Sequence, residues 1–163
     1  MKLATALLWL FVINLGIALG AGLYEHRIVV PEWIGPGPDG LPRWDAEAAR
    51  AADTGRRFWM FVTTGPLTLL TIANLVNAWR SKGPARRPWL VAACAASADR
   101  VLTFAYFIPV MVGLTGALNS AEAVATAQLW SQLNYVRHLL VFGAWVAAIQ
   151  ALIVVHRSSE VSR

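Results

Sequence analysis

Residues 139–155 read LLVFGAWVAAIQALIVV, an apolar run that contains no charged side chain. About 20 mostly apolar helical residues are needed to cross the hydrocarbon layer of a bilayer, which is about 30 Å thick. The run therefore indicates a transmembrane helix, which we place at about residues 121–155. Because this segment is longer than one crossing requires, the helix is expected to tilt or to extend beyond the bilayer.

Three further segments have the same apolar character, at about residues 3–23, 57–79 and 89–117. Of the 163 residues, 57% are hydrophobic and 14% are charged, against roughly 25% charged residues in a soluble domain. We therefore predict an all-α fold in which residues 1–163 form a single membrane domain, a bundle of four transmembrane helices. Residues 1–22 alternatively form a secretory signal, but their apolar run exceeds the roughly 7–15 residues of a signal core, so we favour a retained span.

Basic residues are unevenly distributed among the connections. They crowd the short segment after the second span and also lie before the first span and after the fourth: Arg80, Lys82, Arg86, Arg87, Lys2, Arg157 and Arg163. Because cytoplasmic loops carry an excess of Lys and Arg, we predict an up-down-up-down bundle with both termini inside the cell, in a bacterial-type inner (plasma) membrane. Three tryptophans near span ends are interpreted as interfacial: Trp59, Trp79 and Trp89.

The outer loop, residues 24–56, is rich in Pro, Gly and Trp. Proline and glycine at the density seen in residues 31–43 indicate irregular structure. Residues 45–57 come next with the sequence DAEAARAADTGRR, which predicts a short polar helix capped by Asp45. Two interpretations of Trp33 and Trp44 remain open, because exposed tryptophans form either a lid over a membrane pocket or a contact with the membrane surface.

Polar side chains interrupt the spans on shared helix faces. A charged residue at a helix centre costs at least ~2.5–3.5 kcal/mol in a bilayer, so it usually faces the bundle interior or a wet cavity. The spacing i, i+4, i+7, i+8 groups four residues in the last span: Trp130, Asn134, Arg137 and His138. The third span offers a similar face with two adjacent residues: Asp99, Thr103 and Tyr106, beside Arg100 and Phe107. Thr63 lies in the second span, and Glu25 and His26 come directly after the first.

Depth in the bilayer relates these groups to one another. At 1.5 Å per residue, Arg137, Tyr106 and Thr63 lie roughly 27, 25 and 24 Å above the cytoplasmic helix ends. Asp99 and Arg100 lie roughly 15–17 Å above them. We therefore predict one polar pocket in the outer half of the bundle and a second, structural layer of charge below it.

Each polar group also has a purely structural interpretation. Asp99 and Arg100 neutralise each other or Arg137, as buried charges require. In this interpretation Asn134 forms a hydrogen bond that holds two helices together, and the ring nitrogens of His138 find all their hydrogen-bond partners within the bundle. A metal site would use His26 and His138 with a carboxylate, but no two histidines have a ligand-type spacing, so we predict no metal and no cofactor. Iron, copper, zinc or haem stays an alternative.

Several short motifs resemble one known family when they are taken in order. They are Gly20-Ala21-Gly22-Leu23-Tyr24-Glu25 with Pro31-Glu32-Trp33 after it, then Tyr106-Phe107-Ile108-Pro109, then Trp130-X3-Asn134-X2-Arg137. In order and spacing the chain resembles the anthrone oxygenase-like family of small four-helix membrane proteins. The resemblance implies oxidation of a flat apolar anthrone, or a similar aromatic polyketide, to a quinone with O₂ as co-substrate and no evident organic cofactor.

For such a reaction the protein must supply a base and a group that holds the developing oxyanion. His138 or His26 suits the base, with Glu25 in reserve, while Arg137 and Tyr106 suit the oxyanion. The remaining candidates would bind or orient the substrate: Trp130, Asn134, Phe107, Trp33 and Thr63.

Charge and cysteine content also bear on other functional classes. The net charge is +5, but the basic residues form no stripe along an exposed helix, so nucleic-acid binding is a poor explanation of that charge and no nucleic-acid partner is predicted. The one cysteine, Cys94, is interpreted as a small packing residue. A non-enzymatic subunit or carrier would have a fully paired polar layer, whereas an enzyme would have a cavity lined by Tyr106, Asn134, Arg137 and His138. The expected partners are a hydrophobic small molecule and the lipid bilayer, and a homo-oligomer stays open.

Overall fold

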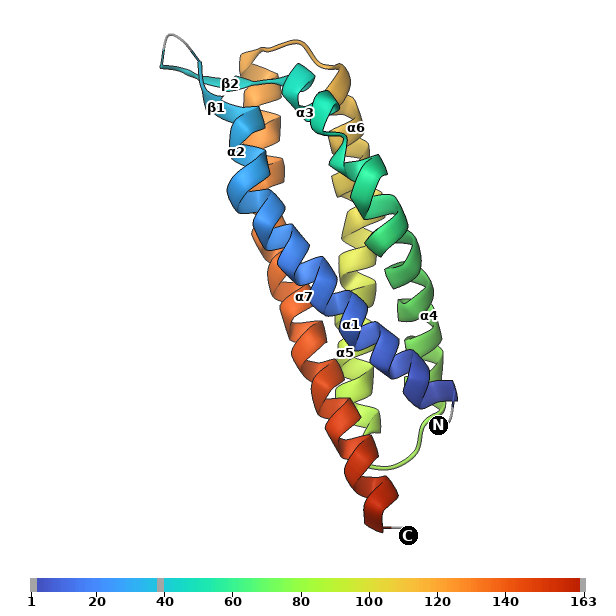
Figure 1. Cartoon of the computed structure of the whole chain (residues 1–163). Coiled ribbons are helices and arrows are strands. Elements are labelled where there is room, and N and C mark those ends of the chain that lie inside the picture. The colour runs from blue at the N-terminus through green and yellow to red at the C-terminus, as the bar shows by residue number, and fades with distance from the viewer. Residues whose placement is uncertain (1–2, 38–39, 162–163) are drawn as a thin grey trace.

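The structure is a computed structural model that describes residues 3–37 and 40–161 and is mostly helical. Four helical spans are long and apolar enough to cross a membrane: Leu3–Trp33, Gly55–Arg80, Arg86–Gly116 and Ala121–Ser158. They lie side by side in one elongated bundle, with both ends of the chain at the same end of it (Figure 1). The predicted all-α fold with four helices long and apolar enough to cross a membrane is therefore confirmed. Lys2 and Arg163 lie outside the described residues.

Three of the four spans contain a wider, π-helical stretch. The first span consists of α1 (Leu3–Tyr24), η1 (Glu25–Val29) and α2 (Val30–Trp33), and the second of η2 (Gly55–Thr64) and α4 (Gly65–Arg80). The third consists of α5 (Arg86–Leu102), η3 (Thr103–Phe107) and α6 (Ile108–Gly116), whereas α7 (Ala121–Val161) is one α-helix. The first span thus continues to Trp33, beyond the predicted end near residue 23, because the polar residues after Tyr24 stay helical.

Prolines explain these wide turns. Each π-helical stretch leads into an α-helix with proline at its second residue: Pro31, Pro66 and Pro109. Proline has no N–H to donate and its ring clashes with the carbonyl four residues earlier. The residue before each proline instead donates to a carbonyl five residues back, which is the π-helical pattern. The orphaned carbonyl of Val62 accepts a hydrogen bond from Asn14 Nδ2 at 2.9 Å, so α1 replaces the bond lost at Pro66.

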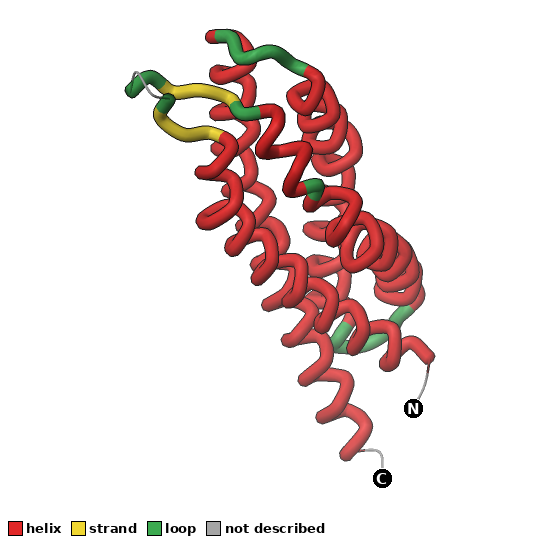
Figure 2. Tube along the Cα trace, turned by 45° about the horizontal axis from the view of Figure 1, so that its top comes forward, coloured by secondary structure: helices red, strands yellow, loops and turns green. Residues whose placement is uncertain are grey.

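The outer connection is more regular than its composition predicted. Strands β1 (Ile34–Pro36) and β2 (Pro42–Trp44) pair as an antiparallel hairpin with Ile34 opposite Trp44 (Figure 2). The expectation of irregular structure was wrong here because the two short strands satisfy each other's backbone groups. Helix α3 (Ala46–Ala52) comes next, and the Asp45 carboxylate accepts from the N–H of Ala48 at 2.9 Å, which confirms the predicted cap. The helix ends earlier than predicted, at a left-handed Asp53 with φ 45°.

Neither tryptophan of the outer connection is exposed. Trp33 and Trp44 each have 2% of their surface accessible and pack in an apolar cluster with Phe107, Leu114 and Trp130. Trp44 Nε1 donates to the carbonyl of Leu114 at 2.8 Å. Both predicted roles, a lid and a contact with the membrane surface, are therefore corrected, because the hairpin folds down onto α6 and α7 and buries the two rings.

The side chains divide between two apolar cores and a lipid-facing exterior. The cluster around Trp33 and Trp44 is the outer core, and a second core, rich in alanine, joins α1, α4, α5 and α7. Cys94 is exposed rather than packed inside. Trp79 is 70% exposed, as an interfacial residue would be, but Trp89 is only 5% exposed and donates from Nε1 to Asn74 Oδ1 at 2.9 Å.

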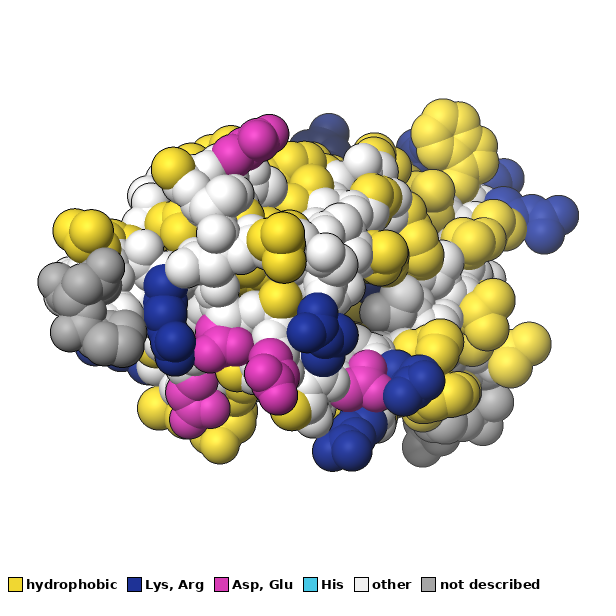
Figure 3. Space-filling model, turned by 90° about the horizontal axis from the view of Figure 1, so that it is seen from above, with side chains coloured by type: hydrophobic (Ala, Val, Ile, Leu, Met, Phe, Trp, Pro, Cys, Tyr) yellow, Lys and Arg dark blue, Asp and Glu magenta, His cyan; other side chains and the backbone are white. Residues whose placement is uncertain are grey.

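The end that carries the hairpin mixes both signs of charge with apolar side chains (Figure 3). Two of its arginines pair with neighbouring acids: Arg43 with Asp45 at 3.0 Å, and Arg56 with Asp53 at 2.8 Å. These exposed pairs contribute little to stability. They neutralise part of the basic charge of this connection locally.

Candidate functional site

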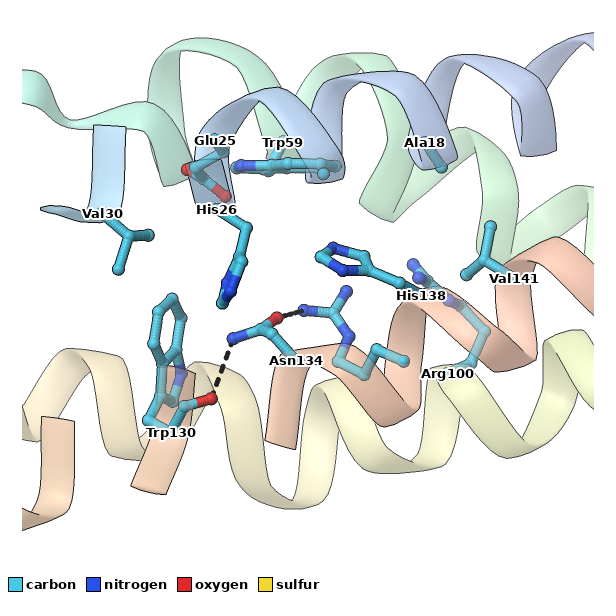
Figure 4. A pocket seen from close by; sticks show the side chains of 12 residues that line it. Ala18, Glu25, His26, Val30, Trp59, Arg100, Trp130, Asn134, His138 and Val141 are labelled. Atoms are coloured by element: carbon cyan, nitrogen blue, oxygen red, sulfur yellow. Dashed lines mark hydrogen bonds between the residues drawn. The ribbon is translucent and has the colours of Figure 1, made fainter. Parts of the chain in front are cut away.

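A polar pocket lies between the outer core and the alanine-rich core and receives side chains from all four spans (Figure 4). The first span contributes its turn from α1 into η1 and α2, the second span η2, the third α5 and the fourth α7. The lining residues are Ala18, Gly22, Glu25, His26, Val30, Trp59, Arg100, Trp130, Asn134, Arg137, His138 and Val141. Eight of these twelve are polar, charged or aromatic, so this part of the bundle is built differently from the apolar layers on either side.

Asp99 is the centre of the charged network beside this pocket. The residue is 0% exposed. Arg100 donates to Asp99 Oδ2 from Nε at 3.1 Å and also from Nη2, and Arg137 donates from Nε to Oδ1 at 3.2 Å. The two charge layers predicted from helix depth are therefore one network. The prediction counted backbone height alone, whereas the long side chain of Arg137 bridges the difference between α7 and α5.

Arg137 is held in one orientation by three kinds of contact. Besides its bond to Asp99, its Nη1 donates to Asn134 Oδ1 at 3.1 Å, and its Cζ lies 4.6 Å from the centre of the Phe107 ring. Asn134 Nδ2 in turn donates to the carbonyl of Trp130 at 3.0 Å, and both Asn134 bonds are drawn in Figure 4. Asn134 is thus not a clamp between helices. These two bonds stay within α7, and they position the guanidinium.

Two histidines face each other across the pocket. The ring centres of His26 and His138 are 5.6 Å apart, and Tyr135 lies 4.4 Å from His26 and 6.4 Å from His138. The Nδ1 atom of each histidine is buried and has no hydrogen-bond partner among the residues that the structure describes. Buried polar atoms nearly always have a partner. The two imidazoles therefore leave two hydrogen-bonding atoms for water or a ligand, and His138 is not the fully bonded histidine of the structural alternative.

Gly22 allows His138 to occupy this place. A Cβ atom at Gly22 would lie 2.9 Å from Nε2 of His138 and 3.7 Å from the Trp59 ring. The first distance is shorter than real carbon–nitrogen contacts allow, so only glycine lets the α1 backbone approach the imidazole this closely. Trp59 itself lies over the pocket, although its sequence position suggested an interfacial residue.

Several predicted site residues do not line the pocket. Tyr106 packs edge-on against Phe107 at 5.1 Å, and Phe107 and Trp33 belong to the outer core. Thr63 is 1% exposed, and its hydroxyl donates to the carbonyl of Trp59 at 3.2 Å. These residues lie in or beside π-helical stretches, which have more residues per turn than an α-helix, so spacing counted on a regular α-helix did not predict which of them face the pocket.

Glu25 does line the pocket, but its carboxylate is already engaged. Its Oε1 accepts a hydrogen bond from the hydroxyl of Thr54, so the predicted reserve base has one oxygen occupied.

Sequence reasoning missed two residues at this site, Trp59 and Tyr135. Tyr135 had a detectable signal, since it lies beside Asn134 and three residues before His138 in the last span.

The free space in the pocket is small. It measures ≈ 20 Å³ for the centres of water molecules, which is room for about one water. Pockets for drug-sized ligands measure about 300–1,000 Å³. A flat aromatic ligand therefore enters only if side chains such as Trp59 or Trp130 move aside.

Among the residues that line the pocket, His26, His138 and Glu25 have side chains of a metal-binding type. Within residues 3–37 and 40–161, no group of three or more His, Cys, Asp or Glu side chains is placed to hold a metal ion. Comparisons with protein-family models, curated proteins and solved structures find no match for this chain. The site has to be interpreted from its own chemistry, and the resemblance to anthrone oxygenases stays a prediction.

Proposed function

We propose that this chain is a membrane-embedded oxygenase that removes a proton from an activated carbon of a flat apolar substrate and lets O₂ oxidise the resulting anion. The main supporting observation is the pair of imidazoles with unpartnered Nδ1 atoms beside the fixed guanidinium of Arg137, among the residues that the structure describes. A general base needs a free nitrogen within reach of the substrate, and a developing oxyanion needs a donor that is already oriented. An anthrone or a similar aromatic polyketide has both the acidic carbon and the carbonyl that this arrangement suits.

The proposed chemistry balances without a bound cofactor. His138 or His26 takes a proton from the substrate CH₂ group, and the negative charge moves onto the carbonyl oxygen, which Arg137 stabilises. The anion passes one electron to O₂, and the two radicals combine to form a C–O bond. The protonated imidazole returns its proton to the peroxide, and loss of water leaves a new carbonyl. The sum is R₂CH₂ + O₂ → R₂CO + H₂O.

An apolar substrate would reach this site from the lipid. Tyr135 is 54% exposed, and its ring centre lies 4.4 Å from that of His26. One aromatic ring therefore stands between the outer surface of α7 and the imidazole. We propose that substrate enters past this ring, in the outer half of a bacterial-type inner membrane, with both termini of the up-down-up-down bundle in the cytoplasm. The basic segment at Arg80–Arg87 supports this orientation.

A second candidate function is a non-catalytic subunit or carrier. The Asp99–Arg137 bond joins α5 to α7, and the free volume of ≈ 20 Å³ is far below that of a typical ligand pocket. Both observations favour charges that hold helices together. Against it stand the nitrogens of His26 and His138 that have no partner in the described part of the chain, which a purely structural network would be expected to satisfy.

The test is turnover by purified protein in lipid nanodiscs supplied with anthrone and air. Anthraquinone absorbance and O₂ consumption should rise together at a ratio of one to one. His138→Ala, His26→Ala and Arg137→Ala should each lower the rate by about 10²–10⁴-fold, the usual contribution of a general base or an oxyanion donor. His156→Ala is the matched control, because His156 lies at the far end of α7 and bonds Leu152 O at 3.3 Å.

Three outcomes separate the candidates. Folded variants that keep full turnover would disprove the assigned roles. No turnover in the wild-type protein would favour the non-catalytic candidate. Metal analysis and an absorption spectrum of the same sample identify a metal- or haem-dependent redox protein, which would use the same two histidines.

A further inference from the structure

The buried network around Asp99 has more positive than negative charge. Two guanidinium groups, those of Arg100 and Arg137, share the single carboxylate of Asp99. Arg100 is 7% exposed and Asp99 0%, so water screens this pair poorly. Buried charges need partners of opposite sign, because moving an ion out of water is costly. These three side chains together have an excess of one positive charge.

The excess positive charge lies next to the pocket. Arg100 uses Nε and Nη2 on Asp99, while its Nη1 is buried and has no hydrogen-bond partner in the part of the chain that the structure describes. Arg100 lines the same pocket as His26 and His138, whose Nδ1 atoms are also unpartnered there. Three buried nitrogens without a partner in the described part of the chain thus surround one small space.

Glu25 is the other acid that lines this space, and it does not neutralise the arginines. Its carboxylate accepts from Thr54, and Figure 4 shows it on the far side of His26 from Arg100. Among the described residues no ion pair joins Glu25 to Arg100 or Arg137. Within this part of the chain, the positive charge therefore faces the cavity without a protein counter-charge.

We propose that the pocket binds one small monovalent oxyanion on Arg100 Nη1, in the space beside the His26 and His138 imidazoles. Because the free space of ≈ 20 Å³ holds about one water, the anion must be small, and formate, which is only two heavy atoms larger than water, needs smaller side-chain shifts than the phosphate group of a lipid. Hydrogen bonds from a guanidinium to a carboxylate are stronger than neutral ones. This inference goes beyond the proposed oxygenase, because it depends on the charges alone and holds if the protein catalyses nothing.

The experiment measures binding of formate to the full chain in phosphatidylcholine nanodiscs. Formate should raise the unfolding temperature with saturation, and the ¹³C-formate signal should broaden in proportion to bound protein. Formamide, which has the same shape but no charge, should do neither. Arg100→Gln should abolish both effects, whereas Arg157→Gln, a change at an exposed arginine near the end of α7, should leave them unchanged.

A second variant keeps the test informative if Arg100→Gln fails to fold. Asp99→Asn removes the carboxylate that the two arginines share, so the concentration of formate at half saturation should fall at least about tenfold. Wild-type protein that responds equally to formate and formamide, or to neither, would overturn the proposal. So would stabilisation by phosphatidylglycerol nanodiscs in the absence of any formate effect, because the anion would then be a lipid headgroup.

Discussion

Gly22→Ala is the sharpest probe of the pocket, because it adds one methyl group at a known place. The new Cβ would lie 2.9 Å from Nε2 and 3.2 Å from Cδ2 of His138. Ordinary van der Waals contact needs about 3.5–4.0 Å, so the imidazole must move by roughly 0.5–1 Å. Overpacking of this kind costs about 1–3 kcal/mol.

Gly20→Ala is the matched control, since it lies two residues earlier on α1. A Cβ at Gly20 would meet nothing within 4 Å. Both substitutions change helix preference by the same amount, so that contribution cancels in the comparison. We therefore expect the free energy of unfolding of Gly22→Ala to lie about 1–3 kcal/mol below that of Gly20→Ala. Reversible unfolding in mixed detergent micelles measures the difference.

The same displacement should also appear in catalysis. Misplacing a catalytic group by about 1 Å lowers a rate by about 10²-fold, so Gly22→Ala should lose anthrone turnover and Gly20→Ala should keep it. Histidine NMR signals would report movement of His138 directly. Equal stabilities of the two variants, together with an unchanged His138 signal, would refute the close approach of α1 and α7 on which the site is built.

Three further changes test separate parts of the structure. Asp99→Leu leaves two buried guanidinium groups without their carboxylate and should lower the free energy of unfolding by about 3–5 kcal/mol; a loss below about 1 kcal/mol would contradict the buried network. Asn134→Ala removes the acceptor of Arg137 Nη1, and loss of this charged hydrogen bond should lower the rate of anthrone turnover about 10–100-fold. An unchanged rate would show that Asn134 does not position the guanidinium. Trp44→Phe removes the hydrogen bond from Trp44 Nε1 to the carbonyl of Leu114 and part of a buried ring, so it should cost about 1–3 kcal/mol in unfolding experiments. Trp79→Phe, at a ring that is 70% exposed, should change stability by less than about 0.5 kcal/mol, and equal effects would contradict the packing of the hairpin.

Local chemistry made some features predictable. The four spans can be located from hydropathy and length, because a stretch that crosses a bilayer must be mostly apolar over about 20 residues. The cap at Asp45 was predictable for a similar reason, since a carboxylate at that position satisfies the N–H of Ala48 within the same turn. Neither conclusion requires knowledge of a distant segment.

Faces and partners were less predictable. Thr63 and Tyr106 lie within the π-helical stretches that precede Pro66 and Pro109, where α-helical spacing no longer predicts the face, and neither lines the pocket. Trp33 and Trp44 looked exposed because the fold of the hairpin onto α6 and α7 is not visible in their neighbours along the chain. Spacing on one helix did group Asn134, Arg137 and His138, which all line the pocket.

The amino-acid sequence by itself determined that this chain has four spans suited to a membrane and where its polar groups lie along each span, because hydropathy and helical periodicity act within one segment. Only the tertiary structure decided that Arg137 reaches Asp99, that Gly22 admits His138, and that three nitrogens face one small space. These are contacts between helices, and they depend on side-chain length, on the number of residues per turn before each proline and on how closely two backbones approach. None of these three quantities can be read along a single helix.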